Sequence, residues 1–430
     1  RRTVYKYFKA AFFALGVLGA GLVGATGASV AAAAEVSAAS QRPQGWQKVE
    51  NPAPVIGLDG RRHEARCSGF PGSDPRFSFW TRRGSVRKLL VYFEGGGACW
   101  DGQSCSFPRV GLPPEVPQFF DTQVPPGTDP ARMDGLLRTN HPSNPVRDWD
   151  MVYIPYCTGD VHIGSASRSY TSVANPFVGL AAGQTLNIQH RGYDNFMVVL
   201  DWIRRQVRAP HQVLVAGSSA GGYGAAVNAH WIGMLYPGAQ MHVLADSAQG
   251  VLPAAFDTSL PGRRSWNPQI APWVFGPNAA AAPSGDLIRR AARSDPFGRY
   301  AQITPHVDPV QIGFYAAMAG GYGAGSCPAR PEVEWHNRMS SELQGRAASQ
   351  RNFRYYVAAG PFHMLLTDPR FYAEQSGGQT VASWVGDLLA GRLRGPAYEA
   401  QSNGLGHGQG GHWSNQACPG CLANWACPAP

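Results

Sequence analysis

The stretch VLVAGSSAGGYGAAV (213–227) places a serine where it could act as a nucleophile. Its G-x-S-x-G pattern, residues 217–221, is typical of a nucleophile elbow, a sharp strand-to-helix turn that holds a serine hydroxyl clear of its own strand. The register of the pattern puts Ser219, and not Ser218, at the centre. The turn also directs the amide of Ala220 toward the space where negative charge develops during acyl transfer. The sequence predicts Ser219 as the nucleophile, the alternative being a Ser/Gly turn without a catalytic role.

The general base and the pocket have two histidine candidates. A serine hydroxyl needs a base to take its proton, and around such a turn the triad follows the order Ser, Asp, His along the chain. His363, just after the apolar run 353–360, fits that order. His162, in TGDVHIG, precedes the serine and is the weaker base; with Asp160 it is a candidate for lining the pocket. The alternatives are a surface loop for His363 and a turn cap for His162.

Two aspartates could orient the base. Asp246 ends the apolar run after the nucleophile helix, and Asp308 follows the next such run. Since the carboxyl ends of parallel strands meet at one edge of a sheet, both would lie near Ser219. Chain order slightly favours Asp308, because the acid usually follows the later strand. Asp246, also a pocket candidate, would then hold loops beside Ser219.

Three glycines could supply backbone amides to the same site. The apolar run 87–97 ends in Gly95, Gly96 and Gly97. Such a loop is similar to the HGGG-type loops whose N–H groups face the tetrahedral oxygen of the intermediate. Glycine lets those amides approach closely, since it has no Cβ. The alternative is a glycine hinge.

The elements that position these residues alternate between strand-like and helical patterns. Continuous apolar runs are typical of parallel strands buried on both faces, and six are present: 87–97, 148–160, 211–217, 240–247, 299–304 and 353–360. Apolar residues recur on one helix face in 194–207, with Asp194 as the expected N-cap, and in 380–393, after Thr380. The small-residue stretch 225–235 is expected to be the nucleophile helix. We therefore expect an α/β fold with a mostly parallel sheet and helices on both faces.

The chain is expected to divide into four parts. Residues 1–34 combine a basic start, an apolar stretch and Ala-x-Ala sites, which is the layout of a signal peptide for export to the periplasm or the medium; an uncleaved anchor is the alternative. Residues 35–60 are a polar lead-in, 61–395 the folded domain and 396–430 a Gly-rich tail that contains cysteines. The Pro/Gly-rich stretches 106–147 and 258–298 are expected to be loops over the sheet.

Charge and cysteine usage limit the function classes. The formal net charge is +9 from 37 basic and 28 acidic residues, and without the four cations of the signal segment 33 face 28, a net +5. This excess is too small to indicate nucleic-acid binding. Eight cysteines in an exported chain indicate disulfides. A zinc site built from the C-terminal CPGCLANWAC with His407 and His412 is the weaker alternative, so we expect no metal.

Together these segments resemble the pectin acetylesterase/Notum family of carboxylesterases. The resemblance covers roughly residues 65–393 and rests on YFEGGGACW, IPYCTGDVHIG, VLVAGSSAGGYGAAVN, LADS, VDPVQ and GPFHMLL, in that order. It implies an α/β-hydrolase fold, secretion and no metal or organic cofactor. The family's triad falls on Ser219, Asp308 and His363, which decides between the two aspartates.

The resemblance also implies an oxyanion hole and leaves the acyl group open. The family's amide donors fall on Gly96, Gly97 and Ala220. Where Notum carries a bulky Trp after its Glu-Gly-Gly, this chain has Gly97, so the acyl pocket is expected to differ. Family members remove acetyl groups from pectin or, in Notum, a long acyl chain from a protein.

The expected function is that of a secreted serine esterase. Its substrates would be acetyl esters of a small molecule or of a polysaccharide such as pectin, cleaved through an acyl-enzyme. We expect a monomer that binds neither nucleic acid nor, once the signal is removed, a membrane. The alternatives are a polyester depolymerase or lipid esterase, a serine peptidase, and a non-catalytic carbohydrate-binding protein on a hydrolase scaffold.

Overall fold

The apolar runs of the sequence form the strands of a large central sheet. The computed structural model describes residues 45–110, 116–320, 331–393 and 397–398, all of which belong to one unit that spans residues 41–430. The strands are β1 (Gln47–Glu50), β2 (Val55–Ile56), β3 (Arg62–His63), β4 (Ser78–Arg82), β5 (Lys88–Phe93), β6 (Asp150–Ile154), β7 (Ala166–Thr171), β8 (Thr185–His190), β9 (Gln212–Ser218), β10 (Gln240–Asp246), β11 (Arg299–Val307), β12 (Phe353–Pro361), β13 (Gln375–Ser376), β14 (Gln379–Thr380) and β15 (Ala397–Tyr398). The α-helices are α2 (Gly102–Cys105), α3 (Gly192–Gln206), α4 (Ala220–Leu235), α5 (Pro272–Phe275), α6 (Leu287–Ser294), α7 (Pro309–Met318), α8 (Pro331–Ser349), α9 (Arg370–Ala373) and α10 (Val381–Ala390). Six short 3-10 turns occupy the loops: η1 (Pro130–Arg132), η2 (Gly135–Leu137), η3 (Pro176–Val178), η4 (Arg263–Trp266), η5 (Ala279–Ala281) and η6 (Ser284–Asp286).

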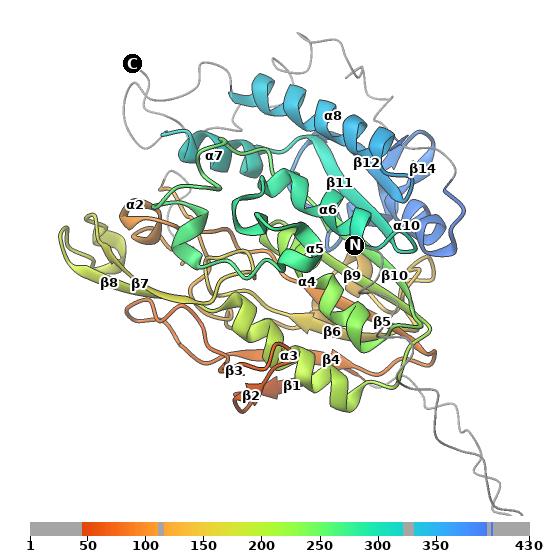
Figure 1. Cartoon of the computed structure of the whole chain (residues 1–430), viewed down its shortest axis with the longest axis horizontal. Helices are drawn as coiled ribbons and strands as arrows, with labels where there is room; N and C mark the ends of the chain where they lie inside the picture. The colour runs from red at the N-terminus through yellow and green to blue at the C-terminus, as the bar shows by residue number, and fades with distance from the viewer. Residues whose placement is uncertain (1–44, 111–115, 321–330, 394–396, 399–430) are drawn as a thin grey trace, which may run out of the picture. The chain divides into compact units, whose positions relative to one another are not determined.

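Nine of these strands make one mixed sheet (Figure 1). Its order is β1-β4-β6-β5-β9-β10-β11-β12-β15, and every pair from β6 to β15 is parallel, whereas β4 and β1 run antiparallel at one edge. The six predicted strands are confirmed, and the fold is a mostly parallel α/β fold. Strands β9, β10, β11 and β12 lie next to one another, so the loops that leave their carboxyl ends are neighbours at one edge.

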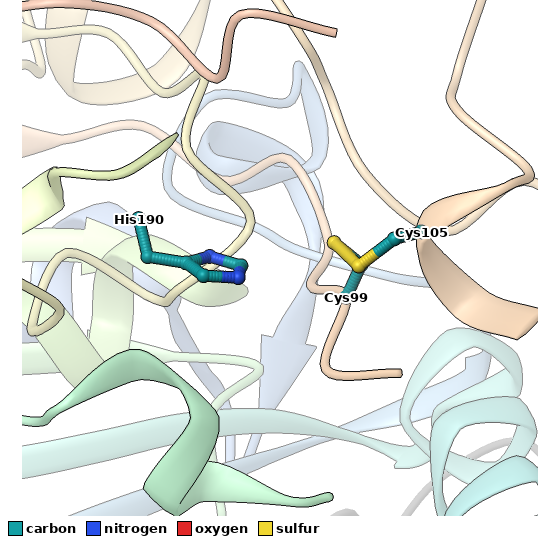
Figure 2. Close-up of side chains that lie close together, drawn as sticks. All are labelled: Cys99, Cys105 and His190. Carbon is teal, nitrogen blue, oxygen red and sulfur yellow. A yellow bond between two sulfur atoms is a disulfide. The ribbon is translucent and has the colours of Figure 1, made fainter. Parts of the chain in front are cut away.

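Two disulfides tie loops to this sheet. Cys67–Cys157 joins the segment before β4 to the one after β6, with the two Cα atoms 5.0 Å apart. Cys99–Cys105 closes a short loop that includes α2 and lies beside His190 of β8 (Figure 2). Disulfide formation is thus confirmed for these four cysteines. The other four, Cys327, Cys418, Cys421 and Cys427, lie outside the described residues.

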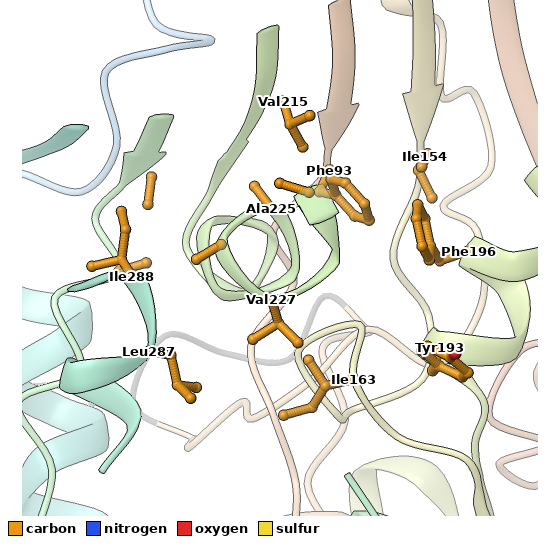
Figure 3. Packing of buried hydrophobic residues seen from close by; sticks show 14 of the residues in the cluster. Phe93, Ile154, Ile163, Tyr193, Phe196, Val215, Ala225, Val227, Leu287 and Ile288 are labelled. Carbon is orange, nitrogen blue, oxygen red and sulfur yellow. The ribbon is translucent and has the colours of Figure 1, made fainter. Parts of the chain in front are cut away.

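Both faces of the sheet are buried, which explains the continuous apolar runs. Alternate residues of β5 and β9, such as Phe93 and Val215, pack with Val227 of α4 and Phe196 of α3 in one large cluster (Figure 3). The residues between them pack on the opposite face against α9, α10 and the loop around Trp149. Helices α6 and α8 pack on the same face of the sheet as α3 and α4. Because both of their faces are covered, the central strands are held rigidly, and the candidate site lies at their carboxyl ends.

The structure corrects several local predictions. Helix α3 begins at Gly192 without a side-chain cap, and Asp194 lies in its first turn, bound to His63 (2.7 Å) instead of capping the helix. Helix α10 follows Thr380, as the apolar pattern predicted, and the Thr380 hydroxyl caps it by accepting from the Ser383 amide. The predicted lead-in contributes β1 to the main sheet, so the folded part begins before residue 61.

The remaining parts of the prediction lie at the ends and in the loops. The described part of 106–147 holds short turns, and 258–298 holds α5, α6 and short turns. The predicted signal peptide, and the tail apart from β15, lie outside the described residues. Within the described ranges, no helix is long and apolar enough to cross a membrane.

Candidate active site

Ser219 occupies the turn between β9 and α4. Its backbone has φ 56° and ψ −126°, a conformation that non-glycine residues seldom adopt and that costs on the order of 1–3 kcal/mol. The turn is tight enough to require glycine on both sides: a Cβ on Gly217 would lie 2.2 Å from the Gly221 carbonyl oxygen, and one on Gly221 would lie 2.0 Å from the Phe93 carbonyl oxygen. The G-x-S-x-G spacing is therefore a packing requirement of this turn.

The neighbouring serine has a different environment. Ser218 is buried; its Oγ accepts from the Tyr92 hydroxyl (2.7 Å) and donates to Asp246 Oδ2 (2.8 Å). Ser219 lines a cavity, and no residue of the described chain makes a hydrogen bond with its hydroxyl. Of the two hydroxyls, that of Ser219 is the one open to a ligand.

Asp246 ties a loop to the sheet. Besides Ser218, its Oδ2 accepts from the amides of Leu365 (2.8 Å) and Leu366 (2.9 Å), which follow His363 in the chain. The carboxyl is completely buried, and burial raises its pKa. These contacts agree with the alternative in which Asp246 holds a loop beside Ser219. Asp246 does not line the cavity.

His363 and Asp308 form a hydrogen-bonded pair. The imidazole Nδ1 lies 2.9 Å from both carboxylate oxygens of Asp308. Asp308 is fully buried and is the N-cap of α7, where its Oδ1 accepts from the amides of Val310 (3.1 Å) and Gln311 (3.0 Å). A carboxylate next to Nδ1 places the proton there, so Nε2 is left free to accept one. The cavity is lined by both His363 and Ser219.

Gln311 is a site residue that the sequence reasoning missed. Its Nε2 donates to Asp308 Oδ2 (2.9 Å) and to Gln249 Oε1 (2.7 Å), while its Oε1 accepts from the Gln249 amide (3.0 Å). A sequence signal was present in VDPVQ: an N-cap residue followed three positions later by Gln, with Pro at the first helical position, is a variant of the capping box.

The cavity is small and largely apolar. Its volume is about 60 Å³. Polar groups are contributed by Ser219, His363, Ser247 and Gln311, among others. The apolar wall includes Val161, Val251, Leu252, Phe256, Trp266, Phe314 and Met318. A cavity with an apolar wall and a few convergent polar groups is typical of a small-molecule binding site.

The glycine loop after β5 borders the same cavity. Gly97 has φ 76°, and a Cβ there would lie 1.8 Å from the Phe119 carbonyl oxygen, so only glycine fits. Gly97 and Ala220 line the cavity, and within the described residues no group accepts a hydrogen bond from either amide. Gly96 is not among the lining residues; its Cα faces Tyr156 and Asp121.

Asp160 and His162 require a correction, because neither lines the cavity. Asp160 is fully buried and accepts from the Thr158 hydroxyl (2.6 Å) and the amides of Gly192 (2.7 Å) and His162 (3.3 Å). The His162 Nε2 lies 2.8 Å from the carbonyl oxygen of Glu94. Burial raises the pKa of Asp160 to about 7 and lowers that of His162 to about 4. Both side chains satisfy internal backbone groups instead of facing a ligand.

Among the described residues, Cys99, Cys105 and His190 are the group spaced for a metal ion (Figure 2). The two sulfurs are joined in a disulfide, and the imidazole nitrogens of His190 bond to the Thr158 carbonyl (2.9 Å) and the Tyr170 hydroxyl (2.8 Å). In this state the group has no free ligand atom. The alternative zinc cluster, with His407 and His412, lies outside the described residues.

This fold and site can be compared with those of known classes of protein. A mostly parallel sheet that carries a serine on a strand-to-helix turn, in one cavity with a histidine bound to a carboxylate, is consistent with a hydrolase-like α/β protein. Residues 56–251 match the family model of Pectinacetylesterase. This match and the relatives described next support a place for the chain in the pectin acetylesterase/Notum family. Ser219 and the glycine loop lie inside the matched region, and Asp308 and His363 lie outside it.

Curated relatives agree with this assignment. The chain is similar to palmitoleoyl-protein carboxylesterase notum1 of Xenopus laevis, with 30% identity over 193 residues that cover 43% of this chain and 35% of the relative. It is also similar to the human palmitoleoyl-protein carboxylesterase NOTUM, with 30% identity over 184 residues that cover 41% and 33%. The planarian enzyme from Schmidtea mediterranea is 26% identical over 170 residues, which cover 38% and 27%. The chain thus spans about a third of the length of the curated relatives it matches.

Proposed function

We propose that this protein is an exported serine esterase that hydrolyses short-chain, acetyl-type carboxylic esters. The observation that carries the proposal is a single cavity lined by Ser219 and by His363, whose Nδ1 lies 2.9 Å from both oxygens of buried Asp308. The match to the family model and the names of the relatives support the ester as the bond that is cleaved.

The residues have complementary parts in the proposed reaction. The Ser219 Oγ attacks the ester carbonyl carbon while its proton passes to His363 Nε2, and Asp308 stabilises the resulting imidazolium. The carbon–oxygen bond to the alcohol then breaks, and the alcohol leaves with that proton. Water, which gives a proton to the same Nε2, attacks the acyl-serine, and the acid is released as the proton returns to Ser219.

Backbone amides would stabilise the tetrahedral oxyanion. The amides of Gly97 and Ala220 border the cavity and have no acceptor in the described chain, so they are free to donate there. The amide of Gly96 is the third candidate donor, named from the family resemblance; Gly96 precedes Gly97 and does not line the cavity. Loss of one such donor costs roughly 10²–10³ in rate in enzymes of this kind.

The size of the cavity favours a small acyl group. A volume of about 60 Å³ corresponds to roughly five water-sized positions at ~10–15 Å³ each. An acetyl or similarly short acyl chain fits within this space, whereas a long lipid chain would have to extend beyond it. Together with the expected export signal in residues 1–34, this favours acetyl esters outside the cell, such as those of an acetylated polysaccharide.

The test separates the two adjacent serines. The oxidised protein without residues 1–34 is assayed on 4-nitrophenyl esters from acetyl to palmitoyl, together with Ser219→Ala and Ser218→Ala. We expect Ser219→Ala to lose turnover and keep its melting temperature. Ser218→Ala, which leaves Tyr92 and Asp246 without their shared partner, should keep turnover and melt earlier. Equal activity of wild type and Ser219→Ala on every ester would refute the proposal and would favour a carbohydrate-binding role.

A further inference from the structure

The segment TGDVHIG holds a valine in an unfavourable backbone conformation. Val161 has φ 49° and the next residue, His162, has φ 62°. For a β-branched residue a positive φ is a true outlier, because the branched side chain collides with its own backbone. Such conformations persist only where the surroundings determine them, and they occur preferentially at functional sites.

Buried polar groups on both sides of Val161 impose this conformation. The carboxylate of Asp160 accepts from the Gly192 amide (2.7 Å) and from the His162 amide (3.3 Å), which fixes the chain on either side of the valine. The Val161 amide itself donates to the Tyr156 hydroxyl (2.8 Å).

The imidazole of His162 is fixed as well. Its Nε2 lies 2.8 Å from the carbonyl oxygen of Glu94, the residue that precedes the glycine loop. Its side chain also lies so close to α4 that a Cβ on Gly224 would come within 2.7 Å of it. The segment is therefore clamped between the glycine loop and the helix that begins after Ser219, and it has little freedom to move.

This arrangement fixes the position of the Val161 side chain. Asp160 and His162 are buried, but Val161 between them lines the cavity together with Ser219. A valine side chain is stiff at χ1, so a fixed backbone also fixes the isopropyl group. Other parts of the wall are adaptable: Met318 of α7 is unbranched and can change rotamer to fill space.

We propose that Val161 is a specificity-determining residue that limits the length of the acyl chain accepted beside Ser219. The proposal rests on the esterase function proposed above. A rigid wall excludes a longer acyl chain because neither the side chain nor the loop can retreat, and one extra methylene against such a wall can change the rate about tenfold or more.

The experiment compares kcat/KM for 4-nitrophenyl butyrate and 4-nitrophenyl acetate in wild type, Val161→Ala and Val161→Gly. Glycine accepts a positive φ without strain, so Val161→Gly should fold, and Val161→Ala supplies a second variant. We expect the butyrate-to-acetate ratio to rise about tenfold or more in both variants. Circular dichroism melts of each variant establish that the ratio is measured on folded protein.

Val310→Ala is the matched control, since it is the same substitution in the same cavity on the regular helix α7. Phe314 and Met318 of that helix can reorient into the space it leaves, so its ratio should change less than threefold. An equal rise in Val310→Ala, or no rise in either Val161 variant, would overturn the proposal. If wild type shows no activity above Ser219→Ala, the esterase function itself fails, which is a different result from active enzyme with unchanged ratios.

Discussion

Replacement of Gln311 tests whether the hydrogen bonds of Asp308 matter for the proposed reaction. The carboxylate receives the Gln311 side-chain amide at Oδ2 (2.9 Å) and two backbone amides at Oδ1, in addition to His363. Gln311→Met keeps the length of the side chain and removes both the donor to Asp308 and the acceptor of the Gln249 backbone amide. Gln311→Glu keeps the shape and replaces the donor by an acceptor at neutral pH.

The magnitude follows from the number of remaining donors. A hydrogen bond to a charged group contributes about 1.5–3 kcal/mol, and each 1.36 kcal/mol is tenfold in rate. Since the two α7 amides still hold the carboxylate of Asp308, we expect the lower end of this range for Gln311→Met, about tenfold in kcat. The effect should fall mainly on kcat, because the lost bond acts on His363 through Asp308, whereas a change in KM would report the place of Gln311 in the cavity wall.

The pH dependence of Gln311→Glu provides a sharper result. Above neutral pH two adjacent carboxylates repel each other, so the rate should fall below that of Gln311→Met. At low pH the introduced carboxyl group is protonated and can donate to Asp308 as the Gln311 amide does. The ratio of Gln311→Glu to wild-type kcat should therefore rise between pH 8 and pH 5.5, while the ratio for Gln311→Met stays flat.

Gln249→Met is the control for this experiment, because it removes the other acceptor of the Gln311 amide and leaves the bond to Asp308 in place. Its kcat should stay within about threefold of wild type. Two results would refute the reasoning: Gln311→Met with wild-type kcat, or parallel pH profiles for Gln311→Met and Gln311→Glu. Either would mean that α7 alone positions Asp308.

Three further predictions concern stability. Burial opposes the protonation of His63, but hydrogen bonds to two carboxylates, one of them Asp59 (2.8 Å), outweigh this effect and raise the pKa of the imidazole. The resulting stabilisation is present below pH 6.5 and is lost as pH rises through the pKa of the folded state. His63→Gln should therefore lower the melting temperature more at pH 6 than at pH 9. Burial raises the pKa of Glu94 to about 7 from 4.5, so the fold loses stability as pH rises through that interval, and Glu94→Gln should raise the melting temperature at pH 8 but not at pH 4. Cys67→Ala/Cys157→Ala removes a link across 90 residues and should destabilise by about 4 kcal/mol in urea unfolding, whereas an unchanged midpoint would show that the bridge does not constrain the unfolded chain.

The central part of the fold could be predicted because its strands are buried on both faces. Their apolar runs are continuous, and glycine marks the carboxyl ends of β5 and β9. The edge strand β1 and its neighbour β4 were not foreseen, because strands of four or five residues have no such long run and β4 depends on β6, far along the chain. The hairpin of β7 and β8 was missed because neither strand has a continuous apolar run; β7 (ASRSYT) is mostly polar and alternates between half-buried and exposed residues.

The site residues divide in a similar way. Ser219 could be located because its turn needs glycines at fixed positions, which the sequence displays directly. The roles of Ser218, Asp246 and Gln311 depend on hydrogen bonds across tens of residues, which no local pattern reveals. Asp160 was recognised as special, but the sequence could not show that its carboxylate faces inward.

Backbone strain provides an indication of the site that is independent of any motif. Non-glycine residues with positive φ are uncommon, yet Val161, Ser219 and Ser247 all have one and all line the same cavity. Met364, directly after His363, has φ 68°, and its amide donates to the Ser247 hydroxyl (3.0 Å). Each such residue costs on the order of 1–3 kcal/mol, a cost that the packed faces of the central sheet must offset. A fold selected for stability alone would place glycine at these positions. Their side chains are therefore retained for what they do at the cavity, and relieving the strain with glycine should stabilise the protein while it alters turnover or acyl selectivity.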